Sequence, residues 1–264
     1  MTGRQIGLAA QCVPGLSPEE TVRVAAAAGF DLVGVTIDPD SWSAKRAAEV
    51  RRIAAGEGIR LHDAEVIRLS RPDDPAHARL IDHAAAAGIA HVIVIGLMAD
   101  RAALIDAVAR LAAHARDAGV QAVLEFGAFT DVPGLPDALA IADAVPGLAV
   151  LVDPLHLARS GGVPDDVASV PVERMPYVQW CDGGAPLPAP DRADLLEEAR
   201  ARRLDVGGGT LPLSDLLTVL PPGMPLMTKV RSTAIAARFP DPVAHARHLH
   251  ASLAGWLHAQ GGLP

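Results

Sequence analysis

Apolar runs and alanine-rich segments alternate along the chain from one end to the other. The apolar runs are short and rich in Val, Ile and Leu, and the segments between them have the length and composition of helices. This alternation is typical of βαβ units, which build a parallel sheet. The pattern predicts eight strands, at residues 6–10, 32–37, 59–67, 91–95, 122–126, 149–152, 177–180 and 226–230.

Residues with strong capping preferences indicate where the predicted helices begin and end. Ser17 is followed at once by Pro18 and then by Glu20, which together predict an N-cap, a first-turn proline and a capping box. Glycines that can close a helix in the left-handed conformation precede the next strand by at most three residues, at Gly29, Gly88 and Gly119.

The number of predicted units favours a closed (β/α)8 barrel, an α/β fold for which 264 residues is a common length. A doubly wound open sheet would also alternate, but its glycine fingerprint is absent after the first strand. We therefore predict a single barrel domain over residues 1–264. Residues 183–209 form the one irregular stretch, predicted as a long loop whose basic run, from Arg200 to Arg203, belongs to a solvated helix end.

Composition narrows the classes of partner. A net charge of -8 without a basic stripe argues against nucleic acid, whose binding needs clustered Lys and Arg. The sequence contains no long uncharged apolar run of the kind that predicts a membrane span, and no export signal is visible at its start. The two isolated cysteines, Cys12 and Cys181, are ordinary in a reducing compartment, so we expect a cytoplasmic protein. Its expected partner is a small-molecule substrate. The sequence leaves open whether it forms a homodimer.

Polar residues end several of the predicted strands, where packing alone gives no reason for a charge. The carboxyl ends of barrel strands carry the chemistry in this architecture, so these side chains are expected to converge. They are His62, Asp63 and Glu65 on the third strand, Glu125 on the fifth, Asp153 and His156 after the sixth, Gln179, Trp180 and Asp182 on the seventh, and Lys229 and Arg231 on the eighth.

Five segments resemble the sugar phosphate isomerase and epimerase family, also called xylose isomerase-like barrels, and the resemblance spans nearly the whole chain. The segments are LEFGAFT around Glu125, VDPLHLARSGG at residues 152–162, YVQWCDG at residues 177–183, EARARRL from Glu198 and GTLPL from Gly209.

The resemblance implies a divalent metal ion (Mg, Mn, Co or Zn) held by four strand-end residues. Three of the family's ligands correspond to Glu125, Asp153 and Gln179, and the Gln version is similar to the dehydratase branch, which includes enzymes acting on dehydroshikimate and inosose. The fourth ligand in the family is a Glu, where this chain has Lys229. The acidic Gly-Glu-Gly-Glu-Leu-Pro pattern upstream is likewise replaced by Gly-Gly-Gly-Thr-Leu-Pro at residues 207–212.

A lysine in this position changes the charge of the predicted site. Three carboxylates with a divalent cation sum to about -1, and two carboxylates with one ammonium group and no metal give the same sum. An ammonium group beside a metal ion would repel it, so we expect weak or absent metal binding. Covalent use of Lys229 as a Schiff base needs its neutral form, which Glu125 and Asp153 would disfavour.

The leading hypothesis is an isomerase, epimerase or dehydratase-type lyase that removes a proton next to a carbonyl of a small hydroxycarbonyl compound. Glu125 is the expected base, Lys229 stabilises the oxyanion, and His156 or His62 moves a second proton. Arginine suits an anionic substrate group. Residues predicted to bind the substrate are His62, Glu65, Arg159, Trp180, Asp182 and Arg231.

Three alternatives remain open. The chain is a non-catalytic barrel that binds a related small molecule, or it is a conventional divalent-metal-dependent member of the family. Alternatively, Glu125 and Asp153 form a structural ion-pair network with Lys229 at the mouth of the barrel.

Overall fold

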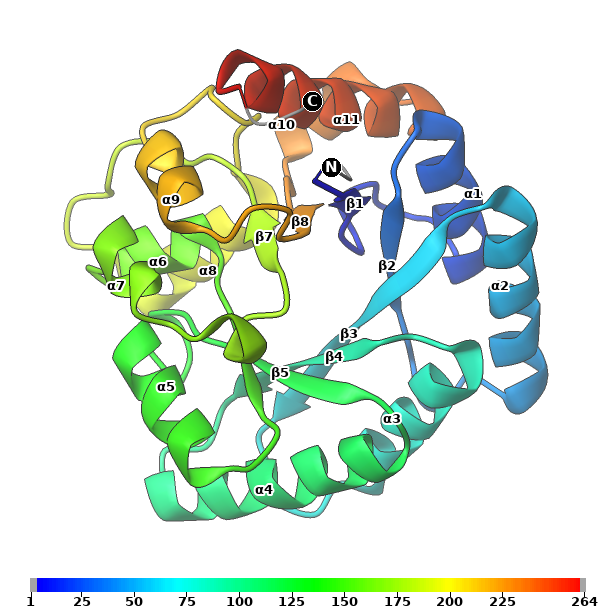
Figure 1. The fold of residues 1–264 in the computed structure, drawn as a ribbon, viewed down its shortest axis with the longest axis vertical. Coiled ribbons are helices and arrows are strands. Elements are labelled where there is room, and N and C mark those ends of the chain that lie inside the picture. Colours follow the sequence, from blue (N-terminus) through cyan, green and yellow to red (C-terminus); the bar gives the residue numbers. More distant parts are fainter. Residues whose placement is uncertain (1–3, 262–264) are drawn as a thin grey trace.

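Eight parallel strands form one sheet in the computed structural model, which describes residues 4–261. Every predicted strand is confirmed, with ends that shift by a few residues. Figure 1 shows the helices arranged as a ring outside these strands. The strands are β1 (Ile6–Leu8), β2 (Leu32–Thr36), β3 (Arg60–Leu69), β4 (His91–Gly96), β5 (Gln121–Glu125), β6 (Ala149–Leu151), β7 (Val178–Trp180) and β8 (Leu226–Thr228).

The sheet curls into a nearly closed barrel. Its strand order is β6-β5-β4-β3-β2-β1-β8-β7, so the chain's first and last strands are neighbours. The two outer strands meet through a parallel bridge between Val152 and Val178, where the Gln179 N–H donates to the Val152 carbonyl at 3.0 Å. The predicted (β/α)8 fold is therefore confirmed.

Helices cover the outside of the barrel, and their starts follow the predicted caps. Ser17 makes the complete capping box with Glu20, and Gly29 closes the same helix in the left-handed conformation. The helices are α1 (Pro18–Ala28), α2 (Ala44–Glu57), α3 (Pro75–Ala87), α4 (Arg101–Asp117), α5 (Leu135–Ala144), α6 (Pro154–Arg159), α7 (Pro164–Ala168), α8 (Arg192–Ala201), α9 (Leu213–Val219), α10 (Thr233–Arg238) and α11 (Pro242–Ala259), with a 3-10 turn η1 (Val172–Arg174). Within residues 4–261, no helix combines the length and apolar character needed to span a membrane.

The long segment after β7 is held in place by one buried carboxylate. Asp182 accepts backbone N–H groups from Gly183 at 2.8 Å, Gly207 at 3.2 Å, Gly209 at 3.0 Å and Leu211 at 3.1 Å. A Cβ atom on Gly209 would collide with this carboxylate and with the Gly183 carbonyl, which explains the glycine there. Asp182 therefore fixes both ends of the segment that carries α8.

Replacing Asp182 with Ala should lower the free energy of unfolding by on the order of 3 kcal/mol, because several donors lose a charged acceptor. Urea denaturation measures this change. Asp215→Ala is the matched control, since Asp215 is an exposed acid whose side chain accepts no hydrogen bond among the described residues, and it should cost less than about 1 kcal/mol. Equal costs for the two variants would show that Asp182 does not organise the segment.

Candidate active site

A cavity of about 160 Å³ opens at the carboxyl ends of the strands. One water molecule needs roughly 10–15 Å³ on this measure, so a small organic molecule fits. The polar and charged lining comes from Glu65, Arg68, Glu125, His156, Arg200, Arg203, Lys229 and Arg231. The apolar lining comes from Val66, Ile93, Ile95, Leu97, Phe129, Leu196 and Ala199.

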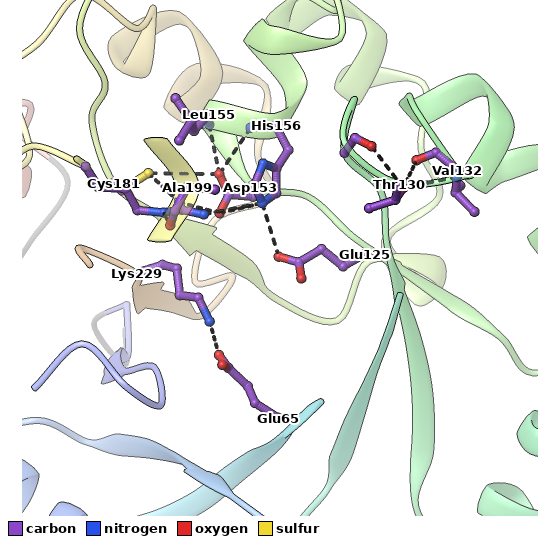
Figure 2. Close-up of polar contacts among 12 residues, drawn as sticks. Glu65, Glu125, Thr130, Val132, Asp153, Leu155, His156, Cys181, Ala199 and Lys229 are labelled. Atoms are coloured by element: carbon purple, nitrogen blue, oxygen red, sulfur yellow. Dashed lines mark hydrogen bonds and ion pairs between the residues drawn. The ribbon is translucent and has the colours of Figure 1, made fainter. Parts of the chain in front are cut away.

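Lys229 is paired with Glu65 across the barrel interior (Figure 2). The lysine lies directly after β8, the glutamate lies on β3, and each residue is 5% exposed. Burial disfavours the ammonium form, but the charges of Glu65 and Glu125 outweigh it and the pKa of Lys229 is raised. Lys229 is therefore a fixed cation at neutral pH.

Asp153 binds a second buried cation, Arg203. One oxygen of Asp153 caps α6 by accepting the backbone N–H groups of Leu155 and His156, at 2.8 and 3.3 Å. The other oxygen accepts from Arg203 Nη1 at 2.6 Å. Burial favours the protonated acid, but the charge of Arg203, joined at acid pH by that of protonated His156, outweighs it and holds the pKa of Asp153 at about 2. Asp153 is therefore ionised and engaged at both oxygens.

The prediction that Arg203 belongs to a solvated helix end is wrong, because this side chain is 1% exposed. After α8 the backbone of Arg202 bridges to Ser232, and the Arg203 N–H donates to the Arg231 carbonyl at 3.1 Å. Neighbouring side chains of such an extended segment point in opposite directions, which leaves Arg202 outside and turns Arg203 inward. One feature of the sequence pointed to a role for Arg203 in the site: it lies in EARARRL, one of the segments that resemble the family.

Four contacts hold the Arg203 guanidinium. Besides Asp153, it donates to the Ala199 carbonyl at 2.8 Å and to Cys181 Sγ at 2.9 Å, and it lies 3.3 Å from His156 Nε2. Burial raises the pKa of the Cys181 thiol to about 12, so this cysteine is not a thiolate at neutral pH. It forms part of the wall behind the site.

His156 lines the cavity as a neutral ring. Its pKa is lowered to about 4, mainly by burial and secondarily by Arg203 against the opposing effect of Asp153. Because a guanidinium group can only donate, the contact with Arg203 makes Nε2 an acceptor and leaves the ring proton on Nδ1. The same Nε2 atom is 3.7 Å from Glu125 Oε1 (Figure 2).

Glu125 lies at the end of β5. Of the three carboxylates Glu65, Glu125 and Asp153, it is the one without a directly bound Lys or Arg among the described residues. With its nitrogen facing the carboxylates, the Gln179 amide donates to Glu125 at 2.9 Å and to Asp153 at 3.2 Å. Burial raises the pKa of Glu125 to about 7, with Lys229 lowering it and Asp153 raising it. Glu125 can therefore both take up and release a proton near neutral pH.

The other predicted substrate contacts divide into two groups. Glu65 and Arg231 line the cavity. The remaining four lie outside its lining: His62 at the start of β3 packs against the Tyr177 ring, Trp180 packs against Trp256, Asp182 holds the segment after β7, and Arg159 pairs with Glu198 at 2.6 Å.

The residues present fit a tightly bound divalent cation poorly. Glu125, Asp153 and His156 bring one potential ligand atom each within 4.8 Å of the others, which is close enough to share an ion. Arg203, however, already contacts two of these three groups. The Gln179 amide faces the same carboxylates and hydrogen-bonds to both of them through its nitrogen when no cation lies between them. A cation here would meet a guanidinium group and an ammonium group, which repel it.

The chain belongs to the xylose isomerase-like TIM barrel family, whose model matches residues 22–221. No curated protein matches the sequence significantly. The family match defines the fold, and in barrels of this kind active sites lie at the carboxyl ends of the strands.

Solved structures show the same fold at low identity. A xylose isomerase-like TIM barrel/4-hydroxyphenylpyruvate dioxygenase fusion protein is 21% identical with a TM-score of 0.77; the match covers 100% of this chain but 45% of the fusion protein. The IOLI protein, solved with a bound zinc atom, is 12% identical with a TM-score of 0.79, covering 97% of this chain and 99% of that one. D-allulose 3-epimerase from Methylomonas sp. is 17% identical with a TM-score of 0.72, covering 98% and 99%. The dehydratase branch expected from Gln179 gains no support from these matches.

Replacing Arg203 with Met should lower the free energy of unfolding by on the order of 3–5 kcal/mol, because Asp153 would stay buried without its cation. The double variant Arg203→Met/Asp153→Asn should recover much of this loss, since it removes the unpaired charge and keeps the helix cap. Denaturant titration measures both.

Arg192→Met provides the control, because Arg192 forms a comparable pair with Asp131 at 3.0 Å but with 64% of its side chain exposed. That substitution should cost less than about 1 kcal/mol. A loss in Arg203→Met no larger than in this control would contradict the structural role assigned to the buried pair.

Proposed function

We propose that this protein isomerises or epimerises a small hydroxycarbonyl compound by proton transfer next to the carbonyl, without a tightly bound divalent metal. The observation that supports this most directly is the pairing of charges. Lys229 binds Glu65 and Arg203 binds Asp153, which leaves Glu125 as the carboxylate free to act as a base. The descriptions of related structures as epimerases support the same class of reaction.

In the proposed reaction, Glu125 removes a proton from the carbon next to the substrate carbonyl, and the bonding electrons move onto the carbonyl oxygen. Lys229 stabilises the resulting negative charge, because an ammonium group has three N–H donors and Glu65 accepts only one of them. Delivery of a proton to the opposite face of the same carbon, by a donor other than Glu125, gives epimerisation. Return of the proton to the neighbouring carbon, after a proton shift between the oxygens, gives isomerisation.

His156 is suited to the second proton shift. Its ring lines the cavity beside Glu125, and its depressed pKa keeps it neutral, so it can both donate and accept. His62 is not placed for this role, because it packs against Tyr177 outside the cavity lining.

A Schiff base on Lys229 is disfavoured by the same electrostatics. The raised pKa of Lys229 keeps the amine protonated, and a protonated amine cannot attack a carbonyl. The lysine therefore acts in this proposal as a fixed positive charge.

Elemental analysis of the purified protein and of the Lys229→Glu variant tests whether the protein works without a tightly bound divalent metal. We expect far less than one divalent ion per wild-type chain after dialysis, and activity that survives a chelator. Lys229→Glu adds a carboxylate ligand and removes a repelling charge, so its metal affinity should rise by at least tenfold. A stoichiometric ion in the wild type that is needed for activity would sink the metal-free mechanism.

The proton-transfer step is tested by deuterium uptake from D2O, followed by NMR, across three- to six-carbon aldoses, ketoses and their carboxylate and phosphate derivatives. At least one compound should exchange the hydrogen next to its carbonyl. Glu125→Gln should slow that exchange by about 100-fold or more, because the base is lost. Glu197→Gln, which alters an exposed glutamate on α8, serves as the control and should leave the rate unchanged. Absence of exchange with every compound would favour the non-catalytic binder.

The exchange rate should rise with pH and level off, with a midpoint near 7. Burial raises the pKa of Glu125 to about 7, so the carboxylate is protonated and inactive as a base below this pH and ionised above it. A pH-rate profile of kcat/KM measures the midpoint. A midpoint near 4.5, the ordinary pKa of a glutamate, would show that burial does not control the base.

A further inference from the structure

Three arginines line the cavity opening without any acidic partner. Arg68 lies near the end of β3, Arg200 in the last turn of α8, and Arg231 follows β8. Arg68 and Arg200 are exposed, and Arg231 is half-buried. Across residues 4–261, none of these three guanidinium groups forms a salt bridge or a side-chain hydrogen bond, whereas Arg46, Arg159 and Arg192 elsewhere each pair with a carboxylate.

The charge of the cavity is opposite to that of the protein. The whole chain carries a net charge of -8, yet the cavity lining contains Arg68, Arg200, Arg203, Lys229 and Arg231 against the carboxylates of Glu65 and Glu125. Arg203 and Lys229 are already neutralised by Asp153 and Glu65. The three remaining arginines are therefore opposed in the lining only by Glu125, which leaves the cavity with an excess of positive charge.

These arginines are close enough to repel one another. The pKa of Arg68 is lowered, first by burial, then by the charge of Arg200 and to a smaller extent by that of Arg231, while the charges of Glu65 and Glu125 raise it. Like charges gathered from three separate elements at a cavity, with no counter-ion in the described chain, indicate that the ligand supplies the counter-ion.

We propose that Arg68, Arg200 and Arg231 bind an anionic group of the substrate, a carboxylate or a phosphate, at the cavity opening. This inference rests on the proposed function, because it names the substrate class of the same cavity. The exposed arginines place the anion near the opening, and Glu125, with 13% of its side chain exposed, takes the reacting end deeper inside. Ile93, Ile95 and Phe129 supply apolar walls for the carbon chain between the two ends.

Calorimetric titration with compounds that lack a reactive carbonyl tests this binding separately from turnover. The probes are a neutral, a carboxylate and a phosphate member of two sets: glycerol, glycerate and glycerol 3-phosphate, and xylitol, xylonate and xylitol 5-phosphate. We expect at least one anion to bind tenfold or more tightly than its neutral counterpart, and to weaken as salt is added. Preference for xylonate or for xylitol 5-phosphate distinguishes a carboxylate site from a phosphate site.

Substitution of each arginine by Gln locates the anion. Arg68→Gln, Arg200→Gln and Arg231→Gln should each weaken the preferred anion by fivefold or more and leave the neutral compound unaffected. Arg23→Gln is the control, because Arg23 is an exposed arginine on α1 outside the cavity lining, and it should change neither affinity. Circular dichroism of each variant checks that the barrel is intact.

Equal affinity for anions and neutral compounds, or no measurable binding of any anion at millimolar concentration, would overturn the inference. Its failure is distinguishable from failure of the proposed function. Tight anion binding without deuterium exchange on any compound would sustain the arginine site and remove the catalytic proposal. Exchange on neutral sugars alone, with no preference for their anionic derivatives, would do the reverse.

Discussion

The ion pair between Asp153 and Arg203 is the interaction on which the geometry of the site depends. Both residues are 1% exposed, and a charge buried to that extent is tolerated only when it is paired and hydrogen-bonded. Both members of the pair also bind neighbouring groups: Asp153 caps α6, and Arg203 contacts Cys181 and His156. The ion pair therefore positions His156 beside Glu125, because Asp153 accepts the backbone N–H of His156 and Arg203 contacts its ring.

The same principle explains how the site accommodates Lys229 at the position where the resemblance to the family implies a metal-binding glutamate. The carboxylates of Glu65, Glu125 and Asp153 with the cations Lys229 and Arg203 sum to about -1 when all are ionised, the same value as three carboxylates around a divalent ion. Two covalently attached monovalent cations thus supply the charge of one divalent ion. The remaining negative charge falls on Glu125, and its raised pKa shows that this charge is costly to keep.

The sequence predicted the fold and the convergence of the strand-end residues because both follow from local patterns. Glu65, Glu125, Asp153, Gln179 and Lys229 meet because the carboxyl ends of parallel strands share one mouth of the barrel. The pairing of these charges was not predictable, since Lys229 finds its partner 164 residues away and the strand stagger selects it. His62 was misplaced because a polar residue at the start of a strand lies towards the opposite mouth. Arg203 was missed because its inward direction depends on the bridge between Arg202 and Ser232.

The two fixed cations differ in what they leave available to a ligand. A guanidinium group has five N–H donors in fixed directions, and Arg203 directs four of them at Ala199, Asp153, Cys181 and His156. It is therefore committed to holding the site together. Lys229 gives one of its three donors to Glu65 and lines the cavity, so two remain for an oxygen that gains negative charge. A metal ion would combine both tasks in one exchangeable centre, whereas the proposed mechanism gives the structural task to Arg203 and the chemical task to Lys229.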